Sequence, residues 1–305
     1  MKEIPYTLAA VDFSESSGQA LHQALRLSDA RGTKLSVIHV VDSRILEGLI
    51  ERVEIDEVGM MVETRKRLHE FVERQIGERI DRVHLHLTLG HPFEEILTTV
   101  KTIRPELLVM GAHGGGADPL RVGMIASKCV RKAPVDVLLV RGDLPHSDRF
   151  QKILVCIDFS DNSKRAANEA LEIASLDGAS IEFLNIYQPF SSRVPIADYF
   201  GIGTGSISDE EMVIAAQEQL DHFVVPLVAD QADLEFATHI EKSHSVATGI
   251  THYALEHGFD LVVLGTRGRS GLNFLLLGTT AEKIIHQSTC TVLTVKPEGF
   301  HFDRG

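Results

Sequence analysis

The sequence predicts an α/β protein made of two tandem domains, each a doubly wound parallel sheet with helices on both faces. Two observations support this prediction. The chain repeats itself, because the segments around Asp12 and Asp158 correspond, as do those around Gly111 and Gly265. Within each copy, short and nearly continuous apolar runs alternate with longer stretches of helical periodicity, which is typical of parallel strands buried on both faces.

The duplication is visible in four pairs of segments. They are 6–14 with 152–160, 35–41 with 181–187, 106–114 with 260–268, and 133–140 with 289–295. The second copy is longer by about eight residues, most simply in the loop that holds residues 201–206, which is predicted to be a flexible connection. The turn-rich segment 141–148 is the natural linker. We therefore predict one domain over residues 1–144 and a second over residues 149–305.

The elements of the second copy follow one another regularly. Strands are expected at 152–157, 181–186, near 234–240, 261–264 and 291–295, and helices from about 160, over 208–229, 246–257 and 279–287. Ser208 and Glu211 form a capping box at the start of the second helix. In such sheets ligands bind beyond the carboxyl ends of the strands, where the strand order reverses. Asp158, Ile186 and Gly265 lie at strand ends, so we expect them to meet at one crevice.

Composition limits the class of protein. The chain of 305 residues is 44% hydrophobic and 24% charged, as soluble globular proteins are, and no apolar run reaches the roughly 18 residues of a membrane span. Its first residues lack the features of a signal peptide, and its three cysteines are far apart. The net charge is −13. We therefore expect a cytoplasmic protein that binds neither nucleic acid nor a membrane.

The segment after the fourth strand of the second copy carries the most informative chemistry. Gly265 ends the strand, Gly268 follows after two residues, and Gly278 precedes two threonines and an apolar helical pattern. Glycines let backbone N–H groups approach a phosphate without a Cβ in the way, and a helix N-terminus favours negative charge. Thr279 and Thr280 each offer a hydroxyl to a phosphate oxygen. The sequence therefore predicts a nucleotide phosphate site.

Two arginines lie in the same loop. We expect Arg267 and Arg269 to reach the bound anion as forked donors. The plainer alternative is an ordinary strand-to-helix connection in which Thr279 is only the helix N-cap. Three glycines and two hydroxyls between a strand and a helix favour the anion site.

The universal stress protein family has an ATP-binding motif that this segment resembles: Gly265-x-x-Gly268, nine residues, then Gly278-Thr279. Asp-Phe-Ser after the first strand of each copy agrees with that family, and the whole chain is similar to its tandem two-domain members. The resemblance implies five parallel strands in each domain, in the order 3-2-1-4-5. It also implies a stress-response protein that binds ATP. Mg²⁺ is compatible with such a site, since it often takes ligands from the nucleotide and water.

Carried over residue by residue, the resemblance places Ile157 and Asp158 near adenine and ribose, and backbone atoms of Ile186 against adenine. It places six residues around the phosphates: Gly265, Arg267, Gly268, Gly278, Thr279 and Thr280. Taken alone, Asp12 and Asp158 have other interpretations. Each could be a metal ligand or a catalytic acid, or a carboxylate that orients a turn and caps the helix behind it.

The first copy departs from the motif. Only eight residues separate Gly114 from Gly123, and Met124 stands where the second copy has a hydroxyl. Asp118 lies in the segment where a triphosphate would bind, and its charge would repel one. We therefore expect ATP to bind mainly through the second domain. The first domain is expected to be a structural partner, or a site for a ligand other than ATP.

The sequence gives little support for nucleophilic catalysis, for a P-loop or for a zinc site. The sequence lacks the Gly-x-Ser-x-Gly motif, a cysteine with an evident base, and the Gly-x-x-x-x-Gly-Lys-Ser/Thr phosphate loop. His84 and His86 alternate along a strand, with His91 and His113 as further candidates, but a zinc site needs three or four ligands. We predict no catalytic residue and no metal site.

Two alternatives to ATP binding stay open: a slow ATPase or other nucleotide-processing enzyme, and a nucleotide-independent module that binds a protein or an apolar ligand. The glycine–threonine motif disfavours the second alternative, and the missing base or nucleophile disfavours the first. The last strands, at 137–140 and 291–295, are candidate sheet edges that pairing would protect. We expect the two copies to pair within the chain as a pseudo-dimer. The sequence leaves open whether two chains form a homodimer.

Overall fold

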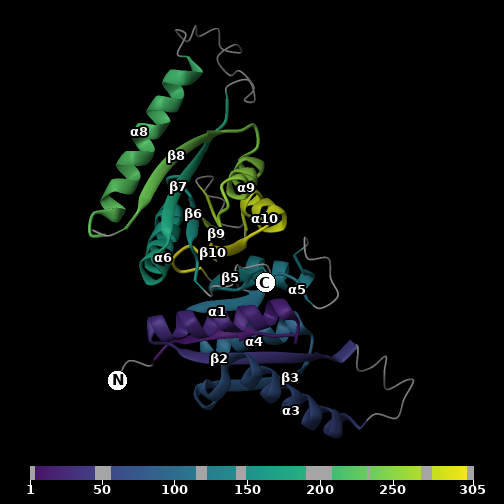
Figure 1. Ribbon diagram of the computed structural model, residues 1–305. Coiled ribbons are helices and arrows are strands. Elements are labelled where there is room, and N and C mark those ends of the chain that lie inside the picture. Colours follow the sequence, from purple (N-terminus) through teal and green to yellow (C-terminus); the bar gives the residue numbers. More distant parts are fainter. Residues whose placement is uncertain are drawn as a thin grey trace. The chain divides into compact units, whose positions relative to one another are not determined.

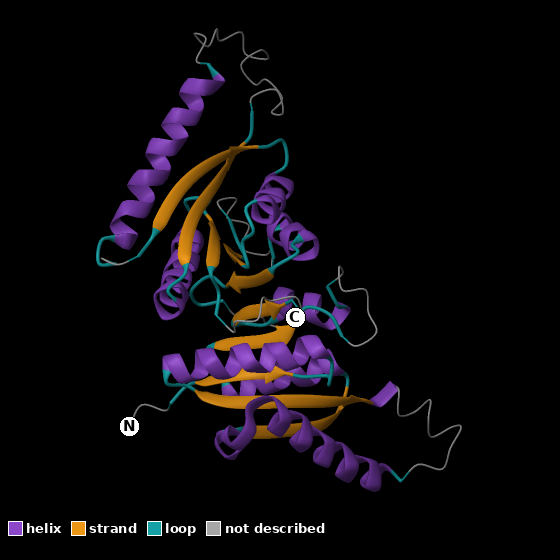
Figure 2. Ribbon diagram, in the orientation of Figure 1, coloured by secondary structure: helices purple, strands orange, loops and turns teal. Residues whose placement is uncertain are grey.

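The computed structural model describes residues 4–44, 56–114, 122–141, 149–189, 208–231, 234–268 and 277–300. By contacts between residues the chain divides into two compact units, one of residues 1–148 with 299–305 and one of residues 149–298. In each unit, strands form a central sheet and helices cover its faces (Figure 1 and Figure 2). The predicted fold class, tandem doubly wound α/β domains, is confirmed. The pairing of the two copies within the chain stays a prediction.

The described part of the first unit has its strands in the spatial order β3-β2-β1-β4-β5, and their pairings are parallel. The strands are β1 (Tyr6–Ala10), β2 (Lys34–Asp42), β3 (His84–Gly90), β4 (Leu107–Gly111) and β5 (Asp136–Val140). The helices are α1 (Glu15–Arg31), α3 (Glu57–Ile76), the 3-10 helix η1 (Gly77–Arg82), α4 (Pro92–Ile103) and α5 (Met124–Lys132). The strand order reverses between β1 and β4.

The second unit repeats this arrangement as β8-β7-β6-β9-β10, again with parallel pairings. Its strands are β6 (Lys152–Cys156), β7 (Ser180–Tyr187), β8 (Phe236–Lys242), β9 (Leu261–Gly265) and β10 (Thr291–Val295). Its helices are α6 (Asp161–Asp177), α8 (Asp209–Val228), α9 (Val246–Glu256) and α10 (Thr279–Gln287). Counted within each unit, both sheets have the order 3-2-1-4-5, as the family resemblance implies.

The central strands form the core of each unit. The first four residues of β9, Leu261–Leu264, are all buried, and so are the last four of β1. A parallel sheet with helices on both faces has no face exposed to solvent, which explains the continuous apolar runs of its strands. The end strand β3 is only partly buried, and it carries His84 and His86. No group of three metal-ligating side chains occurs among the residues that the structure describes.

Helix ends follow the local chemistry of the chain. The predicted capping box is confirmed: Ser208 Oγ accepts from Glu211 N at 3.2 Å, and Glu211 Oε2 accepts from Ser208 N at 2.8 Å. Within the seven described ranges, no helix combines the length and the apolar character that crossing a membrane would require. The predicted loop at 201–206 lies outside these ranges, as does the linker apart from Arg141.

Candidate functional site

A pocket of about 480 Å³ lies at the carboxyl ends of the strands of the second unit. It lies beside β6 and β9, the neighbouring strands between which the strand order reverses. Its lining includes nine of the ten predicted site residues: Ile157, Asp158, Ile186, Gly265, Arg267, Gly268, Gly278, Thr279 and Thr280. The tenth, Arg269, lies outside the described residues.

The turn after β6 fixes the orientation of Asp158. Its Oδ1 accepts hydrogen bonds from Ser160 N at 3.0 Å and from Ser160 Oγ at 2.5 Å. Ser160 is the N-cap of α6, and its Oγ accepts from Ser163 N at 3.1 Å. Asp158 therefore orients the turn and the capping serine, as the plainer interpretation of this carboxylate expected. It also lines the pocket, so the two roles are compatible.

Between Asp158 and Ser160 the backbone adopts an unusual conformation. Phe159 has a φ of 63°, in the left-handed region that residues other than glycine rarely occupy. Its ring packs edge-on against Phe223 of α8, with 5.6 Å between the ring centroids. Such outliers persist where the surrounding structure holds them, and they concentrate at functional sites. In this turn the Phe159–Phe223 contact and the Asp158–Ser160 bonds hold the conformation.

The glycine loop approaches its neighbours too closely for side chains. A Cβ on Gly268 would lie 2.5 Å from Asp158 Oδ2, and one on Gly265 would lie 2.6 Å from Asn162 Nδ2. Neither glycine has a positive φ that would require it. The sequence needs glycine here because these side chains fill the space that a Cβ would occupy.

Asn162 is a residue that the sequence analysis missed. It is buried in the first turn of α6, and its Nδ2 donates to Arg267 O at 3.3 Å and to Val295 O at 3.2 Å. It thus ties the glycine loop to the helix and to the last strand. The signal available in the sequence was the polar residue at the matching position of the first copy, Ser16, whose Oγ donates to His113 O at 2.6 Å.

Helix α10 begins at the pocket with Gly278 as its N-cap, and within the described part of the chain no side chain caps this helix start. The alternative in which Thr279 is the N-cap is therefore wrong, since Thr279 is the first helical residue. The side chains of Thr279 and Thr280 are exposed and line the pocket. Free N–H groups at a helix N-terminus, with hydroxyls beside them, suit an anion.

The pocket lining also has an apolar part. Ile186 at the end of β7 and Val246 and Ile250 of α9 form it. Beneath them Asn185 Nδ2 donates to Ile157 O at 2.7 Å, which joins β7 to the residue that follows β6. Apolar lining residues together with an anion-binding helix end suit a ligand with a flat apolar part and a charged tail.

A cysteine also lines the pocket, but its chemistry is that of a neutral thiol. Burial raises the pKa of Cys156 well above its usual range, and the nearby Cys290 and Asp158 act in the same direction. Only the thiolate is an effective nucleophile. Cys156 therefore lacks the reactive form at neutral pH.

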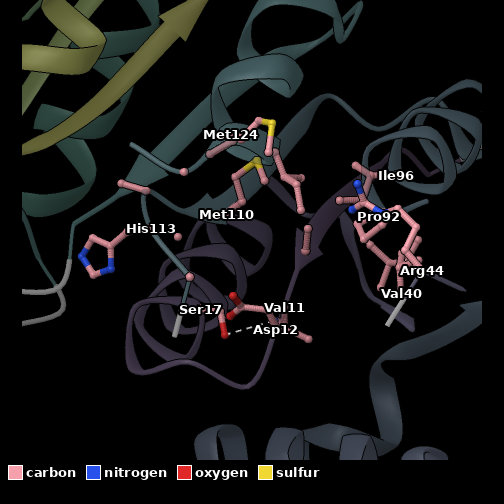
Figure 3. Close-up of a pocket in the computed structure, with 18 residues that line it drawn as sticks. Val11, Asp12, Ser17, Val40, Arg44, Pro92, Ile96, Met110, His113 and Met124 are labelled. Carbon is pink, nitrogen blue, oxygen red and sulfur yellow. Dashed lines mark hydrogen bonds between the residues drawn. The ribbon is translucent and has the colours of Figure 1, made fainter. Parts of the chain in front are cut away.

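The first unit has a pocket at the same topological position, with a volume of about 350 Å³ (Figure 3). Its glycine loop repeats the close approach, because a Cβ on Gly114 would lie 2.7 Å from Asp12 Oδ2. Helix α5 again begins after a glycine N-cap, Gly123, with no side-chain cap. Met124 stands at the head of that helix where the second unit has Thr279, as the sequence indicated. Asp118 lies outside the described residues.

Fold and site together define a tandem doubly wound α/β protein with a glycine-loop pocket beside the switch point of its second sheet. A sequence profile of the universal stress protein family matches residues 7–141 and 149–296. The chain therefore belongs to the universal stress protein family, as its motifs indicated.

Individual relatives agree with this assignment. A universal stress protein of Mycolicibacterium smegmatis is 22% identical over 298 residues, which cover 95% of this chain and 96% of the relative. One of Methanocaldococcus jannaschii is 30% identical over 151 residues, 48% of this chain and 82% of the relative. The crystal structure of a universal stress protein from Archaeoglobus fulgidus DSM 4304 has a TM-score of 0.65 at 19% identity, and the match covers 95% of this chain and 96% of that one. This last likeness is one of fold.

Proposed function

We propose that this protein is a cytoplasmic stress-response protein that binds ATP, together with Mg²⁺, mainly through its second domain. The observation that carries the proposal is the convergence of the Gly265–Gly268 loop, the uncapped start of α10 and Asp158 on one pocket. Each comes from a different part of the chain, and each suits a different part of a nucleotide.

The proposal assigns the parts of ATP by chemistry. Adenine lies against the apolar part of the lining formed by Ile186, Val246 and Ile250, and the phosphates lie at the start of α10. There the backbone N–H groups and the hydroxyls of Thr279 and Thr280 supply donors to negative oxygens. The pocket volume, about 480 Å³, falls within the range of about 300–1,000 Å³ that is usual for small-molecule sites. Mg²⁺ would take its ligands from phosphates and water.

Binding fits this pocket better than rapid hydrolysis does. The thiol of Cys156 is held neutral by burial, and Oδ1 of Asp158 already accepts two hydrogen bonds from Ser160. We therefore propose a nucleotide-dependent change of partner or shape rather than an efficient ATPase.

Thermal unfolding with and without ATP and Mg²⁺ tests the proposal. A ligand that binds only the folded state adds about 2.7 kcal/mol of stability at a hundredfold excess over its dissociation constant. Thr279→Val removes one hydroxyl from the phosphate end, and we expect it to weaken ATP binding by about tenfold. Met124→Val at the matching position of the first unit is the control and should leave the ATP effect unchanged.

Two results would contradict the proposal. One is the absence of any stabilisation by ATP and Mg²⁺ at millimolar concentration. The other is an equal loss of stabilisation in the Thr279→Val and Met124→Val variants, which would show that the effect does not arise at the second pocket. Mass spectrometry of nucleotides extracted from the protein as purified gives an independent measurement.

A further inference from the structure

We propose that the pocket of the first domain binds an uncharged, largely apolar small molecule in place of a nucleotide. The proposal rests on a comparison of equivalent positions in the two pockets. It is independent of whether the second pocket binds ATP, because the two pockets are built from different residues.

Near the helix start, three of the four differences remove a hydroxyl, and the fourth replaces a permanent cation. The equivalent pairs are Ala112 for Thr266, His113 for Arg267, Met124 for Thr279 and Ile125 for Thr280. Three hydroxyls are thus replaced by hydrocarbon or thioether, and a permanent cation by an imidazole. An anion bound at the start of α5 would meet the backbone N–H groups of the helix, but apolar side chains would stand where the second unit has hydroxyl donors, so less of the energy of desolvating it would be recovered.

The apolar part of the lining is kept in the first pocket. Val11, Val40, Pro92 and Ile96 line it at the positions of Ile157, Ile186, Val246 and Ile250 in the second unit. The first pocket therefore has apolar side chains both at the helix start and in this part of its lining, whereas the second pocket has hydroxyls at the helix start. Its volume of about 350 Å³ lies in the range of about 300–1,000 Å³ typical of ligand sites.

Two methionines adapt the pocket to hydrocarbon. Met110 is buried at the end of β4, and Met124 is 68% exposed at the head of α5. Figure 3 shows both above Asp12, with Val40, Pro92 and Ile96 to one side. Methionine side chains are flexible and polarisable, and they are common where a surface must fit apolar partners of irregular shape. An exposed methionine at the pocket edge is thus a natural contact for such a ligand.

The charges around the pocket disfavour an anionic ligand. Asp12 brings a carboxylate into the lining, and its Oδ1 accepts from Ser14 N at 3.1 Å. Arg44 also lines the pocket, but its guanidinium is paired with Asp42 through contacts of 2.9 Å and 2.5 Å. The imidazole of His113 is directed away from the methionines in Figure 3. The site therefore suits an uncharged aromatic or aliphatic molecule, with an O–H or N–H donor at most for Asp12.

The test uses N-phenyl-1-naphthylamine, an uncharged aromatic amine whose fluorescence rises in apolar surroundings. With the full chain we expect a saturable signal that corresponds to one site per chain. Met124→Glu places a charge at the pocket edge without disturbing the core, and should weaken probe binding by about tenfold or more. The control is Val62→Glu on α3, because Val62 is 64% exposed and outside the pocket lining. It should bind the probe as the parent does.

The same titration contains the results that would overturn the proposal. One such result is the absence of a saturable probe signal. Another is that Met124→Glu and Val62→Glu weaken probe binding equally. Displacement of the probe by ATP at the same ATP concentration in the parent and in the Thr279→Val variant would show nucleotide in the first pocket, and would also overturn the proposal. A protein that binds the probe but is not stabilised by ATP would leave this proposal supported and refute only the proposed function.

Discussion

Gly268 and Asp158 form a pair in which the glycine leaves room for the carboxylate. The Cβ that Gly268 lacks would lie 2.5 Å from Oδ2 of Asp158, closer than carbon and oxygen atoms approach without a bond. The pair recurs in the first unit, where the equivalent distance from Gly114 to Asp12 is 2.7 Å. The aspartate after the first strand and the second glycine of the loop therefore act as one structural unit. That unit is present in both copies, although only in the second do the first two residues of the following helix carry hydroxyls.

This pair predicts the effect of Gly268→Ala. The added methyl group must displace either the loop or the carboxylate, and overpacking of this kind costs about 1–3 kcal/mol of stability. If the loop holds phosphates, its displacement also weakens ATP binding. Thermal unfolding with and without ATP and Mg²⁺ measures both effects in one experiment.

Gly114→Ala is the matched control for this variant. It creates the same clash with Asp12, so its cost in stability without ligand should be similar. Because we assign ATP to the second pocket, the stabilisation by ATP should be unchanged. If Gly268→Ala binds ATP like the parent, the glycine loop of the second unit is not part of a phosphate site.

The strands and helices were predictable because their signals are local. Buried parallel strands such as 261–264 form unbroken apolar runs, and capping residues such as Ser208 mark helix starts. The strand expected near 234–240 is β8, Phe236–Lys242. This strand lies at the end of the sheet and is mostly exposed or half-buried, so its apolar pattern is weak and its boundaries were harder to place.

The pocket was predictable in part for the same reason. Glycines and threonines beside a strand end form a contiguous motif, and the structure gathers them as the topology requires. Asn162 belongs to no contiguous motif, because its amide reaches a loop carbonyl 105 residues away along the chain. Nor could the sequence tell that Gly278, rather than Thr279, is the N-cap of α10. Contacts between distant segments, and one-residue choices at helix ends, depend on the folded geometry.

The contacts of Asn162 predict that its removal lowers both the stability of the protein and its affinity for ATP. Asn162→Ala removes the two hydrogen bonds that the side-chain amide donates to Arg267 O and Val295 O, and the loss of both should cost about 1–3 kcal/mol of stability. The freed loop should also weaken ATP binding. Isothermal titration with ATP and Mg²⁺, beside urea unfolding without ligand, separates the two effects.

The first unit suggests a conservative variant at Asn162, because it has a serine at the equivalent position. Ser16 holds the equivalent carbonyl, that of His113, through its hydroxyl at 2.6 Å, so Asn162→Ser should restore part of the loop bond. We expect ATP affinity in the order parent, then Asn162→Ser, then Asn162→Ala. Equal affinity for all three proteins would show that the tie between α6 and the loop has no influence on the site.

His39 predicts how stability depends on pH. Burial lowers the pKa of His39 below its ordinary value of 6.5, and Arg67 acts in the same direction, while the bond to Val11 O and the nearby Asp12 oppose them. The ring donates from Nδ1 to Val11 O at 2.8 Å, as Asn185 donates to Ile157 O at 2.7 Å in the second unit. The unfolded chain then binds a proton more readily than the folded one. Stability from this group is complete above about pH 6.5 and is lost as the pH falls towards the folded pKa.

His39→Asn should keep the hydrogen bond to Val11 O, because Asn185 makes the equivalent bond in the second unit. It removes the titratable imidazole. We therefore expect the variant to lose less stability than the parent when urea unfolding is compared at about pH 7 and about pH 5. The pKa of His86 is also lowered, by burial and by His84, so the variant should reduce the pH dependence without abolishing it. His22→Asn, at a histidine that bonds Gln75 instead of a buried carbonyl, is the comparison. If both variants change with pH as the parent does, the buried imidazole of His39 is not a source of acid sensitivity.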